Sequence, residues 1–297
     1  MLTCNLKGGL GNQLFQIFTT IECALTNKIP FFFVDIYQLG NGSNGSTIRY
    51  TYWDTFLSYL KPFLKNINQL PGLIIMPEKN YMYNPLPKLT NDNSYVLDGY
   101  FQCPKYFEKS KISIFKLIKL ELNKLSVKTL CPMDYENIIS MHFRLGDYKK
   151  FPNFHPILND EYYKNATLYI LEQIQTNKRG QKEEPKKRKK EEQIKILYFC
   201  EDSDLTEVTD IILKLQNNLE FSKIIFERSD PKLEDWQQML QMSLCKYNII
   251  ANSTFSWWGA YFNQNIDKIV CYPELWFGPD GPNSSDLFPH DWHKIIL

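Results

Sequence analysis

Hydrophobic and polar positions at the start of the chain follow the patterns of a strand, a helix and a second strand. Residues 2–6 form a short extended run, and within 13–27 apolar residues recur close to a 3.6-residue period. Pro30 ends the helical pattern, and the continuous apolar run 31–34 is typical of a buried parallel strand. The two strand patterns are separated by a glycine-rich turn and the helix, so this order predicts a βαβ unit.

A second series of the same kind begins at residue 137. Strand patterns lie at 137–143, 194–200, 223–226, 247–251 and 269–272, and helical patterns lie at 160–176, 205–215, 233–245 and 256–262. Before this series, 40–95 is less regular, 95–97 resembles a strand and 112–127 a helix. We therefore predict an α/β chain of two Rossmann-like βα domains, residues 1–132 and 133–297.

Composition and charge exclude several classes of protein. Of the 297 residues, 43% are hydrophobic and 15% aromatic, which excludes a largely disordered chain. The 34 Lys and Arg residues balance 33 Asp and Glu residues to a net charge of +1, which argues against a nucleic-acid partner. A charged ligand must then be held by a local site.

The segment 177–193 differs from the rest of the chain because it contains no apolar residue. It is predicted to be a charged, mobile insertion, with a nuclear-localisation signal or a nucleic-acid contact as the alternative. Within it, residues 178–192 carry eight basic and four acidic side chains, so the remaining chain has 26 basic and 29 acidic residues. The folded body is thus slightly acidic.

The spacing of the cysteines and the hydropathy of the chain indicate in which compartment of the cell the protein is found. The seven cysteines contain no CxxC pair and are interpreted as reduced thiols rather than metal ligands. The first residues lack a charged region followed by a long apolar stretch, and the window 247–266 is too polar to span a membrane. We expect a cytoplasmic protein with no transmembrane segment and at most a peripheral association with a membrane.

The glycine-rich turn at residues 8–12 is the first candidate for chemistry. Gly9 and Gly11 permit a close approach of backbone to ligand, and the N-terminus of the following helix offers N–H groups to an anion. The alternative interpretation is a tight turn in which Asn12 caps the helix.

The second candidate is the segment 142–148, His-Phe-Arg-Leu-Gly-Asp-Tyr, at the end of a predicted strand. Ligands of α/β folds gather at the carboxyl ends of strands. Arg144 offers a planar fork of donors suited to phosphate, and an extended backbone places His142 on the same side. Asp147 could orient Arg144, accept a proton or cap a turn, and His142 could equally be a structural histidine.

The third candidate is the segment 252–260, Asn-Ser-Thr-Phe-Ser-Trp-Trp-Gly-Ala, between a predicted strand and a helix. Ser253, Thr254 or Ser256 can cap the helix, and the backbone amides around them form a second anion site. A purely capping role is the alternative. Trp257 and Trp258 are predicted to pack in the core.

Taken in order, these three motifs resemble the bacterial-type α-1,2-fucosyltransferases of glycosyltransferase family 11. Segments 98–102, 105–107, 199–202 and 286–292 are also similar to that family. The resemblance implies a GT-B fold, in which an acceptor-side domain and a GDP-sugar-binding domain face a cleft. It also implies an inverting, metal-independent transfer of L-fucose from GDP-β-L-fucose to the 2-hydroxyl of a galactose-containing glycan acceptor.

The resemblance also implies roles for single residues. Arg144 would neutralise the leaving diphosphate in place of a metal ion, and Asn12 would lie near the reacting sugar. The expected donor-binding residues are Gly9, Gly11, Asn12, Arg144, Asn252, Ser253, Thr254 and Ser256. The expected catalytic residues are Arg144, Asp147 and His142, and the candidates for the general base are Asp147, His142, His155 and Asp98.

One position departs from the family pattern, and two alternative functions stay open. The family commonly has a second arginine where this chain has Leu145. The first alternative is a GT-B glycosyltransferase that uses another GDP-sugar or acceptor. The second is a nucleotide-sugar-binding protein without catalytic activity.

Overall fold

The computed structural model describes residues 1–40, 48–66, 72–180 and 193–297, in two compact units. Unit 1 comprises Met1–Ser126 and Pro282–Pro289, and unit 2 comprises Val127–Gly281 and His290–Leu297. The prediction that 133–297 forms one continuous C-terminal domain is therefore wrong for 282–289. That segment is held in unit 1 by Asp286, which accepts hydrogen bonds from the Tyr83 N–H (3.0 Å) and from Lys105 Nζ (2.6 Å).

Unit 1 contains a parallel sheet at its centre. The described strands of this sheet have the order β1–β7–β6, where β1 is Leu2–Cys4, β7 is Ser94–Asp98 and β6 is Leu73–Pro77. A parallel bridge from Leu2 to Phe31 leads to a second parallel pair, β2 (Phe33–Val34) with β5 (Leu64–Lys65). An antiparallel pair, β3 (Gln38–Leu39) with β4 (Arg49–Tyr50), follows β2.

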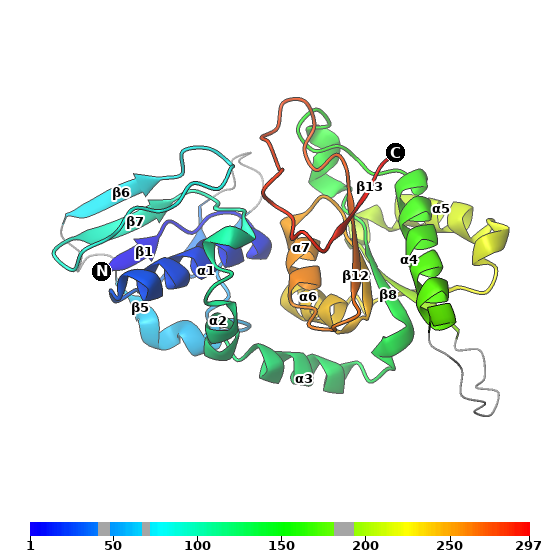
Figure 1. Ribbon diagram of the computed structural model, residues 1–297, viewed down its shortest axis with the longest axis horizontal. Helices are drawn as coiled ribbons and strands as arrows, with labels where there is room; N and C mark the ends of the chain where they lie inside the picture. Colours follow the sequence, from blue (N-terminus) through cyan, green and yellow to red (C-terminus); the bar gives the residue numbers. More distant parts are fainter. Residues whose placement is uncertain (41–47, 67–71, 181–192) are drawn as a thin grey trace. The chain divides into compact units, whose positions relative to one another are not determined.

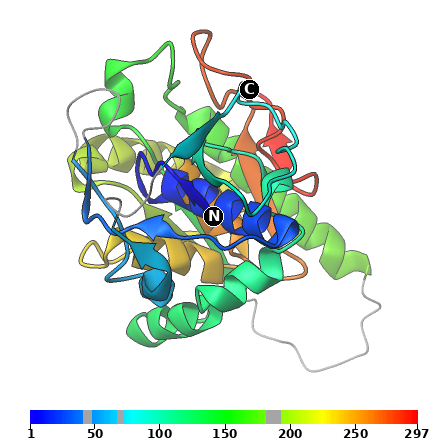
Figure 2. The same ribbon diagram turned by 90° about the vertical axis from the view of Figure 1, so that its left-hand side faces the viewer.

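Helix α1 (Leu10–Asn27) packs against β1 in unit 1 (Figures 1 and 2). It begins before the predicted residue 13, and its N-cap is Gly9 rather than Asn12, which is the third residue of the helix. The helix ends at Lys28 in the left-handed conformation, with φ 54°. Most of its residues from Leu10 to Ala24 are buried, which explains the apolar period along this segment.

The single helix predicted over 112–127 is two helices, α2 (Lys111–Leu117) and α3 (Leu120–Leu130). Lys119 lies between them with φ 53°, a left-handed conformation that no helix interior contains. Ile118 and Leu120, on either side of the break, are both buried, so the apolar pattern continues across it.

Among its described residues, unit 2 has a six-stranded sheet of parallel strands in the order β10–β9–β8–β11–β12–β13. The strands are β8 (Ile138–His142), β9 (Lys195–Phe199), β10 (Ile225–Arg228), β11 (Tyr247–Ile249), β12 (Ile269–Pro273) and β13 (His293–Ile295). In chain order this is 3-2-1-4-5-6, the doubly wound Rossmann order. The predicted α/β class with two βα units is confirmed.

Helices cover both faces of this sheet (Figure 1). On one face lie α4 (Asp160–Gly180) and α5 (Leu205–Gln216), and on the other lie α6 (Asp235–Leu244) and α7 (Thr254–Tyr261). Helix α4 continues to Gly180, beyond its predicted end at 176, and most of the predicted charged insertion, 181–192, lies outside the described residues. Trp257 and Trp258 are fully buried, so the prediction that they are core residues is confirmed.

Short 3-10 helices complete the described structure. They are Ser58–Phe63, Pro104–Tyr106, Tyr135–Asn137, Gly146–Lys150, Asp202–Asp204 and Leu219–Phe221. All seven cysteines are free thiols, and five of them are buried. Across the described ranges, no helix combines the length and the apolar character needed to cross a membrane.

Candidate active site

The topology of unit 2 brings two of the predicted motifs together. Strands β8 and β11 are neighbours and parallel, with Met141 opposite Ile249, so the segments that follow them leave the same edge of the sheet side by side. The two segments are joined where the Tyr148 hydroxyl donates to the carbonyl oxygen of Asn252 at 2.9 Å. In doubly wound sheets the strand order reverses at this point, and ligands bind outside the carboxyl ends of these strands.

Arg144 is the central charged group at this edge. Its Nη2 donates to Asp147 Oδ1 at 2.6 Å, its Nη1 donates to Glu201 Oε1, and its guanidinium lies 5.3 Å from the centre of the Tyr148 ring. The side chain is 19% exposed. Burial opposes its charge, but Glu201, Tyr148 and Asp147 outweigh burial and raise the pKa of Arg144. These two ion pairs use two of its five N–H donors, so Arg144 is a fixed cation that can still bind an anion.

Glu201 and Asp204 belong to this site, although they were not predicted as site residues. Strand β9 runs parallel to β8, with Phe199 opposite His142, so the acidic residues after β9 lie at the same edge. Both carboxylate oxygens of the buried Asp204 accept the Gly146 N–H, at 3.0 and 2.9 Å, and so fix the turn after Arg144. The signal in the sequence was an acidic run directly after an apolar strand.

His142 is the last residue of β8 and is only 7% exposed. Burial, and to a smaller extent the charge of Arg144, lowers the pKa of His142 to about 3. The ring is thus neutral at pH 7, and its Nδ1 is buried with no hydrogen-bond partner among the described residues. Such a weak base is poorly suited to accept a proton from an acceptor hydroxyl, which argues against the predicted catalytic role of His142.

Two other candidates for the general base lie near Arg144. Asp147 is partly exposed and bound to Arg144 as described. His155 stacks on Tyr148, with 4.1 Å between ring centroids and 12° between ring planes. Burial lowers the pKa of His155, and the charge of Arg144 adds to this while Asp147 opposes it. Of these two, Asp147 is the one in direct contact with the cation.

The segment 252–256 divides into structural side chains and accessible ones. Asn252 is buried, and its Nδ2 donates to the carbonyl oxygens of Pro156 (2.8 Å) and Trp276 (3.3 Å). The hydroxyl of Ser256 has no exposure and donates to the carbonyl oxygens of Ala251 and Ser253, both at 3.3 Å. The side chains of Asn252 and Ser256 therefore hold the turn together through these bonds, while the Oδ1 of Asn252 is buried with no partner among the described residues, and their contact with the donor stays a prediction.

Ser253 caps helix α7 at this turn. Its Oγ accepts the Phe255 N–H at 3.4 Å, and Thr254, the first residue of the helix, is partly exposed. The first N–H groups of a helix lack acceptors within the helix and carry a partial positive charge. The N-terminus of α7 thus lies at the edge where β8 and β11 end, the same edge that Arg144 follows.

In unit 1 the predicted glycine-rich turn is tied to the segment after β7. Gly8 has φ 81°, and the Asn12 side chain lies 2.5 Å from the position that a Cβ at Gly8 would take, so only glycine fits there. Asn12 Oδ1 accepts a hydrogen bond from Gln102 Nε2 at 3.0 Å. Gly9 and Gly11 lie at the N-cap and within the first turn of α1.

Two glutamines of the same motif have structural roles that were not predicted. Gln16 is fully buried, accepts the Lys7 N–H at 3.0 Å and donates to the carbonyl oxygen of Gly99 at 3.0 Å, which connects the turns after β1 and β7. Gln13 donates to the carbonyl oxygens of Gly8 (3.1 Å) and Tyr50 (2.9 Å). They hold the glycine-rich turn in one conformation.

Asp98, the remaining candidate for the general base, ends strand β7. It pairs with Lys7 at 3.1 Å and is partly exposed. The neighbouring Glu78 accepts the N–H groups of Tyr100 (2.7 Å) and Phe101 (3.0 Å) and so supports Phe101 at φ 51°. Burial raises the pKa of Glu78, although these two N–H groups oppose the rise.

The structure also shows what occupies the position at which the family commonly has a second arginine. Leu145 is buried in the core of unit 2, in a cluster that includes Ile139, Leu158 and Tyr162. An arginine there would place a charge among apolar side chains. In the described part of the chain, no group of three or more His, Cys, Asp or Glu residues is arranged to hold a metal ion.

Comparison with known proteins gives distant matches among solved structures. No protein-family model matches the chain. A mutant of Arabidopsis thaliana FUT1 in complex with GDP has a TM-score of 0.45 at 12% identity, over 98% of this chain and 75% of that one. A glycosyl transferase family 9 protein from Veillonella parvula has a TM-score of 0.33 at 15% identity, over 59% of this chain and 40% of that one.

Two curated relatives match at full length. The O-antigen biosynthesis glycosyltransferase WbnK of Escherichia coli is 30% identical over 99% of this chain and 100% of that protein. An α-1,2-colitosyltransferase of Escherichia coli is 26% identical over 99% of both chains. The chain therefore belongs to the glycosyltransferase family of WbnK.

Proposed function

We propose that this glycosyltransferase transfers L-fucose from GDP-β-L-fucose to the 2-hydroxyl of a galactose-type acceptor, with inversion and without a metal ion. The observation that carries the proposal is Arg144, held as a fixed cation at the same sheet edge as the N-terminus of α7, at the reversal point of a Rossmann sheet. The motif resemblance supports fucose as the donor sugar. The name of the 26% identical relative supports a 6-deoxy sugar and an α-1,2 linkage.

The proposed chemistry is a single displacement at the anomeric carbon. The acceptor oxygen bonds to C1 of the sugar, the bond from C1 to the β-phosphate oxygen breaks, and GDP leaves with the bonding electron pair. Arg144 and the first N–H groups of α7 stabilise the negative charge that develops on the leaving phosphate. Asp147 and Glu201 hold the guanidinium in position, and Asp204 holds the turn that carries it.

The acceptor hydroxyl must lose a proton in this step. His142 is buried, whereas the carboxylates of Asp147 and Asp98 are partly exposed and can be reached by an acceptor hydroxyl, so these two candidates are tested first. Replacing each by Asn keeps the size of the side chain and removes its basicity. For Asp98→Asn, loss of transfer with retained binding of GDP-fucose identifies Asp98 as the base. Because Asp147 also positions Arg144, Asp147→Asn identifies the base only if the acidic limb of the pH profile of kcat disappears as well. Wild-type activity of both variants excludes both residues from this role.

The first test is Arg144→Ala, assayed by GDP release from GDP-fucose in the presence of a β-galactoside. We expect transfer to fall by about 10²–10³, since a charge-stabilising contact to the transition state is lost. Arg144→Lys should recover only part of the rate, because Lys lacks the planar fork. Lys214→Ala is the control, because it removes an exposed ion pair with Asp160 elsewhere in unit 2. Full activity of Arg144→Ala would remove this residue from the mechanism.

The metal-free mechanism has its own test. Transfer should be unchanged when the enzyme is dialysed against EDTA and assayed in EDTA. Loss of activity in EDTA that is restored by Mg²⁺ or Mn²⁺ would contradict this part of the proposal.

A second candidate donor sugar is colitose, which the name of one relative favours. The fucose donor and the corresponding colitose donor should be compared by kcat/KM on one acceptor, with the product linkage determined by mass spectrometry. A higher value with the colitose donor would replace fucose in the proposal. Binding of both donors without turnover would instead favour a nucleotide-sugar-binding protein without catalytic activity.

A further inference from the structure

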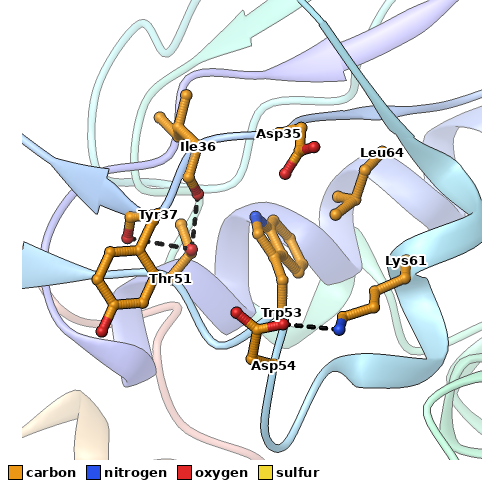
Figure 3. Close-up of a pocket in the computed structure, with 8 residues that line it drawn as sticks. All are labelled: Asp35, Ile36, Tyr37, Thr51, Trp53, Asp54, Lys61 and Leu64. Carbon is orange, nitrogen blue, oxygen red and sulfur yellow. Dashed lines mark hydrogen bonds and ion pairs between the residues drawn. The ribbon is translucent and has the colours of Figure 1, made fainter.

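Unit 1 contains an open pocket of about 380 Å³ beside the carboxyl end of β2, shown in Figure 3. Its lining comes from the segment that follows β2, from 51–54 and from 61–64. Ligands of parallel sheets collect beyond the carboxyl ends of the strands, and the pocket lies at such an end. Its volume is near the lower end of the roughly 300–1,000 Å³ usual for small-molecule sites, which suits a single sugar unit.

Trp53 supplies a donor to this pocket. The residue is 4% exposed and its ring stacks on Phe33, with 5.5 Å between ring centroids. Its Nε1 is buried and has no hydrogen-bond partner among the described residues. Figure 3 shows this nitrogen on the side of the indole ring that faces Asp35 and Thr51. A buried indole N–H normally has an acceptor, so its absence points to an acceptor that a ligand supplies.

The charged groups of the pocket favour an uncharged ligand. Asp54 pairs with Lys61 at 2.6 Å, and within the described ranges no cation pairs with the exposed carboxylate of Asp35. Asp35 is therefore the charged group of the pocket that is open to a ligand, and its carboxylate repels an anion. A carboxylate is a strong acceptor for hydroxyl groups, and the indole N–H is a donor that a hydroxyl oxygen can accept.

The remaining wall offers a ring and a fixed backbone. Tyr37 is 66% exposed and its ring centroid lies 5.1 Å from that of Tyr50, so the two rings together form an exposed outer edge of this wall. The hydroxyl of Thr51 donates to the carbonyl oxygens of Ile36 (2.7 Å) and Tyr37 (3.2 Å), as the dashed lines in Figure 3 show. These bonds fix the segment that carries Asp35 and Tyr37, so the wall is formed before a ligand arrives.

We propose that this pocket binds a neutral sugar unit of the acceptor glycan, with sugar hydroxyls donating to Asp35 and accepting from the Trp53 N–H. The inference rests on the proposed glycosyl transfer, and it adds the subsite that selects the acceptor. The donor is excluded from this pocket by its diphosphate. Asp35 and Trp53 are thus specificity-determining residues, separate from the groups that stabilise the leaving phosphate.

The kinetic test uses Asp35→Asn, with Asp92→Asn as the matched control at an exposed aspartate of unit 1 that does not line the pocket. Asp35→Asn should raise the KM for the galactoside by about tenfold, the effect of losing one hydrogen bond to a charged group. The KM for GDP-fucose and the slow hydrolysis of GDP-fucose by water should stay unchanged. An unchanged acceptor KM in Asp35→Asn overturns the inference.

A binding test separates this inference from the proposed function. Saturation-transfer NMR measures binding of the methyl glycosides of galactose, glucose, N-acetylgalactosamine and N-acetylglucosamine in the absence of any donor. At least one should bind the wild type, and Asp35→Asn and Trp53→Phe should each weaken it about tenfold while circular dichroism shows a folded protein. Binding of none, or binding equal in both variants, overturns the subsite even if fucose transfer is found. Binding without turnover of GDP-fucose retains the subsite and contradicts the proposed function.

Discussion

Asp204 shows at the residue scale how a buried charge positions the candidate site. Its carboxylate accepts the Gly146 N–H through both oxygens, and Ser203 Oγ lies 3.4 Å from Oδ1. Gly146 itself has little space, because a Cβ there would lie 3.2 Å from Glu201 Oε2. The turn that presents Arg144 is thus fixed from two sides by acidic residues that follow β9.

Asp204→Ala should therefore lower both stability and transfer. The variant leaves the Gly146 N–H without its acceptor, which costs about 1–3 kcal/mol. Urea unfolding measures the change in the free energy of unfolding, and the transfer assay measures the misplacement of Arg144. Asp210→Ala, at an exposed position of α5, is the control and should change neither. Wild-type stability of Asp204→Ala would contradict the positioning role.

The buried His142 predicts how the stability of the protein changes with pH. Its pKa is about 3 in the folded protein and 6.5 when unfolded, so the unfolded chain binds more protons between these values. Stability from this residue is present above pH 6.5 and is lost as the pH falls, by about 2 kcal/mol at pH 5. Unfolding of the wild type by urea at pH 7 and pH 5 should show this loss together with that of the half-buried His155 and His293, whose pKa values burial also lowers.

The control for that prediction compares how much the free energy of unfolding changes between pH 7 and pH 5 in the wild type and in two variants. His142→Gln removes the titrating ring, so its stability should fall less than that of the wild type between pH 7 and pH 5. His290→Gln, at an exposed position, should have the wild-type slope. Equal slopes in all three proteins would show that His142 is protonated in the folded state.

The sequence predicted which segments form the site better than it predicted what each side chain does. Arg144 and Asp147 lie together as expected, because both follow one strand end and are three residues apart. The side chains of Asn252 and Ser256 turn inward to satisfy buried carbonyl groups, which depends on partners such as Trp276 that are distant in sequence. Glu201 was missed because its pairing with Arg144 requires the strand order β9–β8.

At the scale of elements, the contact between α6 and α7 determines where the turn 252–254 lies. Gly259 of α7 faces α6, and a Cβ there would lie 2.9 Å from Met242 Cβ and 3.4 Å from the Met239 carbonyl oxygen. This close packing is possible only without a side chain. Since Ser253 caps the same helix, a shift of α7 would move the backbone donors at the sheet edge that Arg144 follows.

Gly259→Ala should thus destabilise unit 2, although alanine favours a helix over glycine by about 1 kcal/mol. Overpacking of this kind typically costs about 1–3 kcal/mol, and the expected sign is a loss. The measurement is urea unfolding together with the KM for GDP-fucose, which should rise. Gly40→Ala is the matched control, because no atom of the described residues lies within 4 Å of its Cβ position. Increased stability of Gly259→Ala would refute the close contact.

Most elements were predictable from hydropathy, and the failures have physical reasons. The break at Lys119 was invisible because one residue with positive φ hardly changes the spacing of buried side chains. Strand β6 has exposed Ile74 and Ile75 at a sheet edge, so its apolar run does not alternate. Strand β13 has only three residues, which is too short for a periodic signal.

At the scale of the whole molecule, the chain enters unit 2 after Ser126 and returns to unit 1 for residues 282–289. The return depends on Asp286, which is separated from Lys105 by 181 positions. No local pattern in the sequence carries that information. The segment 286–292 was prominent only through its resemblance to a family motif.

Asp286→Ala should release this segment without unfolding either sheet. The variant loses the bonds to the Tyr83 N–H and to Lys105, so we expect a small loss in stability, about 1 kcal/mol, and faster chymotrypsin cleavage after Leu287. Mass spectrometry of the fragments identifies the cleaved bond. Asp280→Ala, at an exposed position just before the segment, should be cleaved at the wild-type rate.

The position of residues 282–289 in the chain also determines when unit 1 can be completed during synthesis on the ribosome. Residues 1–126 of unit 1 are synthesised before unit 2, but unit 1 is completed only when Pro289 has been added, after nearly all of unit 2. At about 5–20 residues per second, the interval between Ser126 and Pro289 lasts roughly 8–33 s. During this time the nascent unit 1 has no Asp286 to bind Tyr83 and Lys105, so its final form depends on residues that are synthesised after nearly all of unit 2.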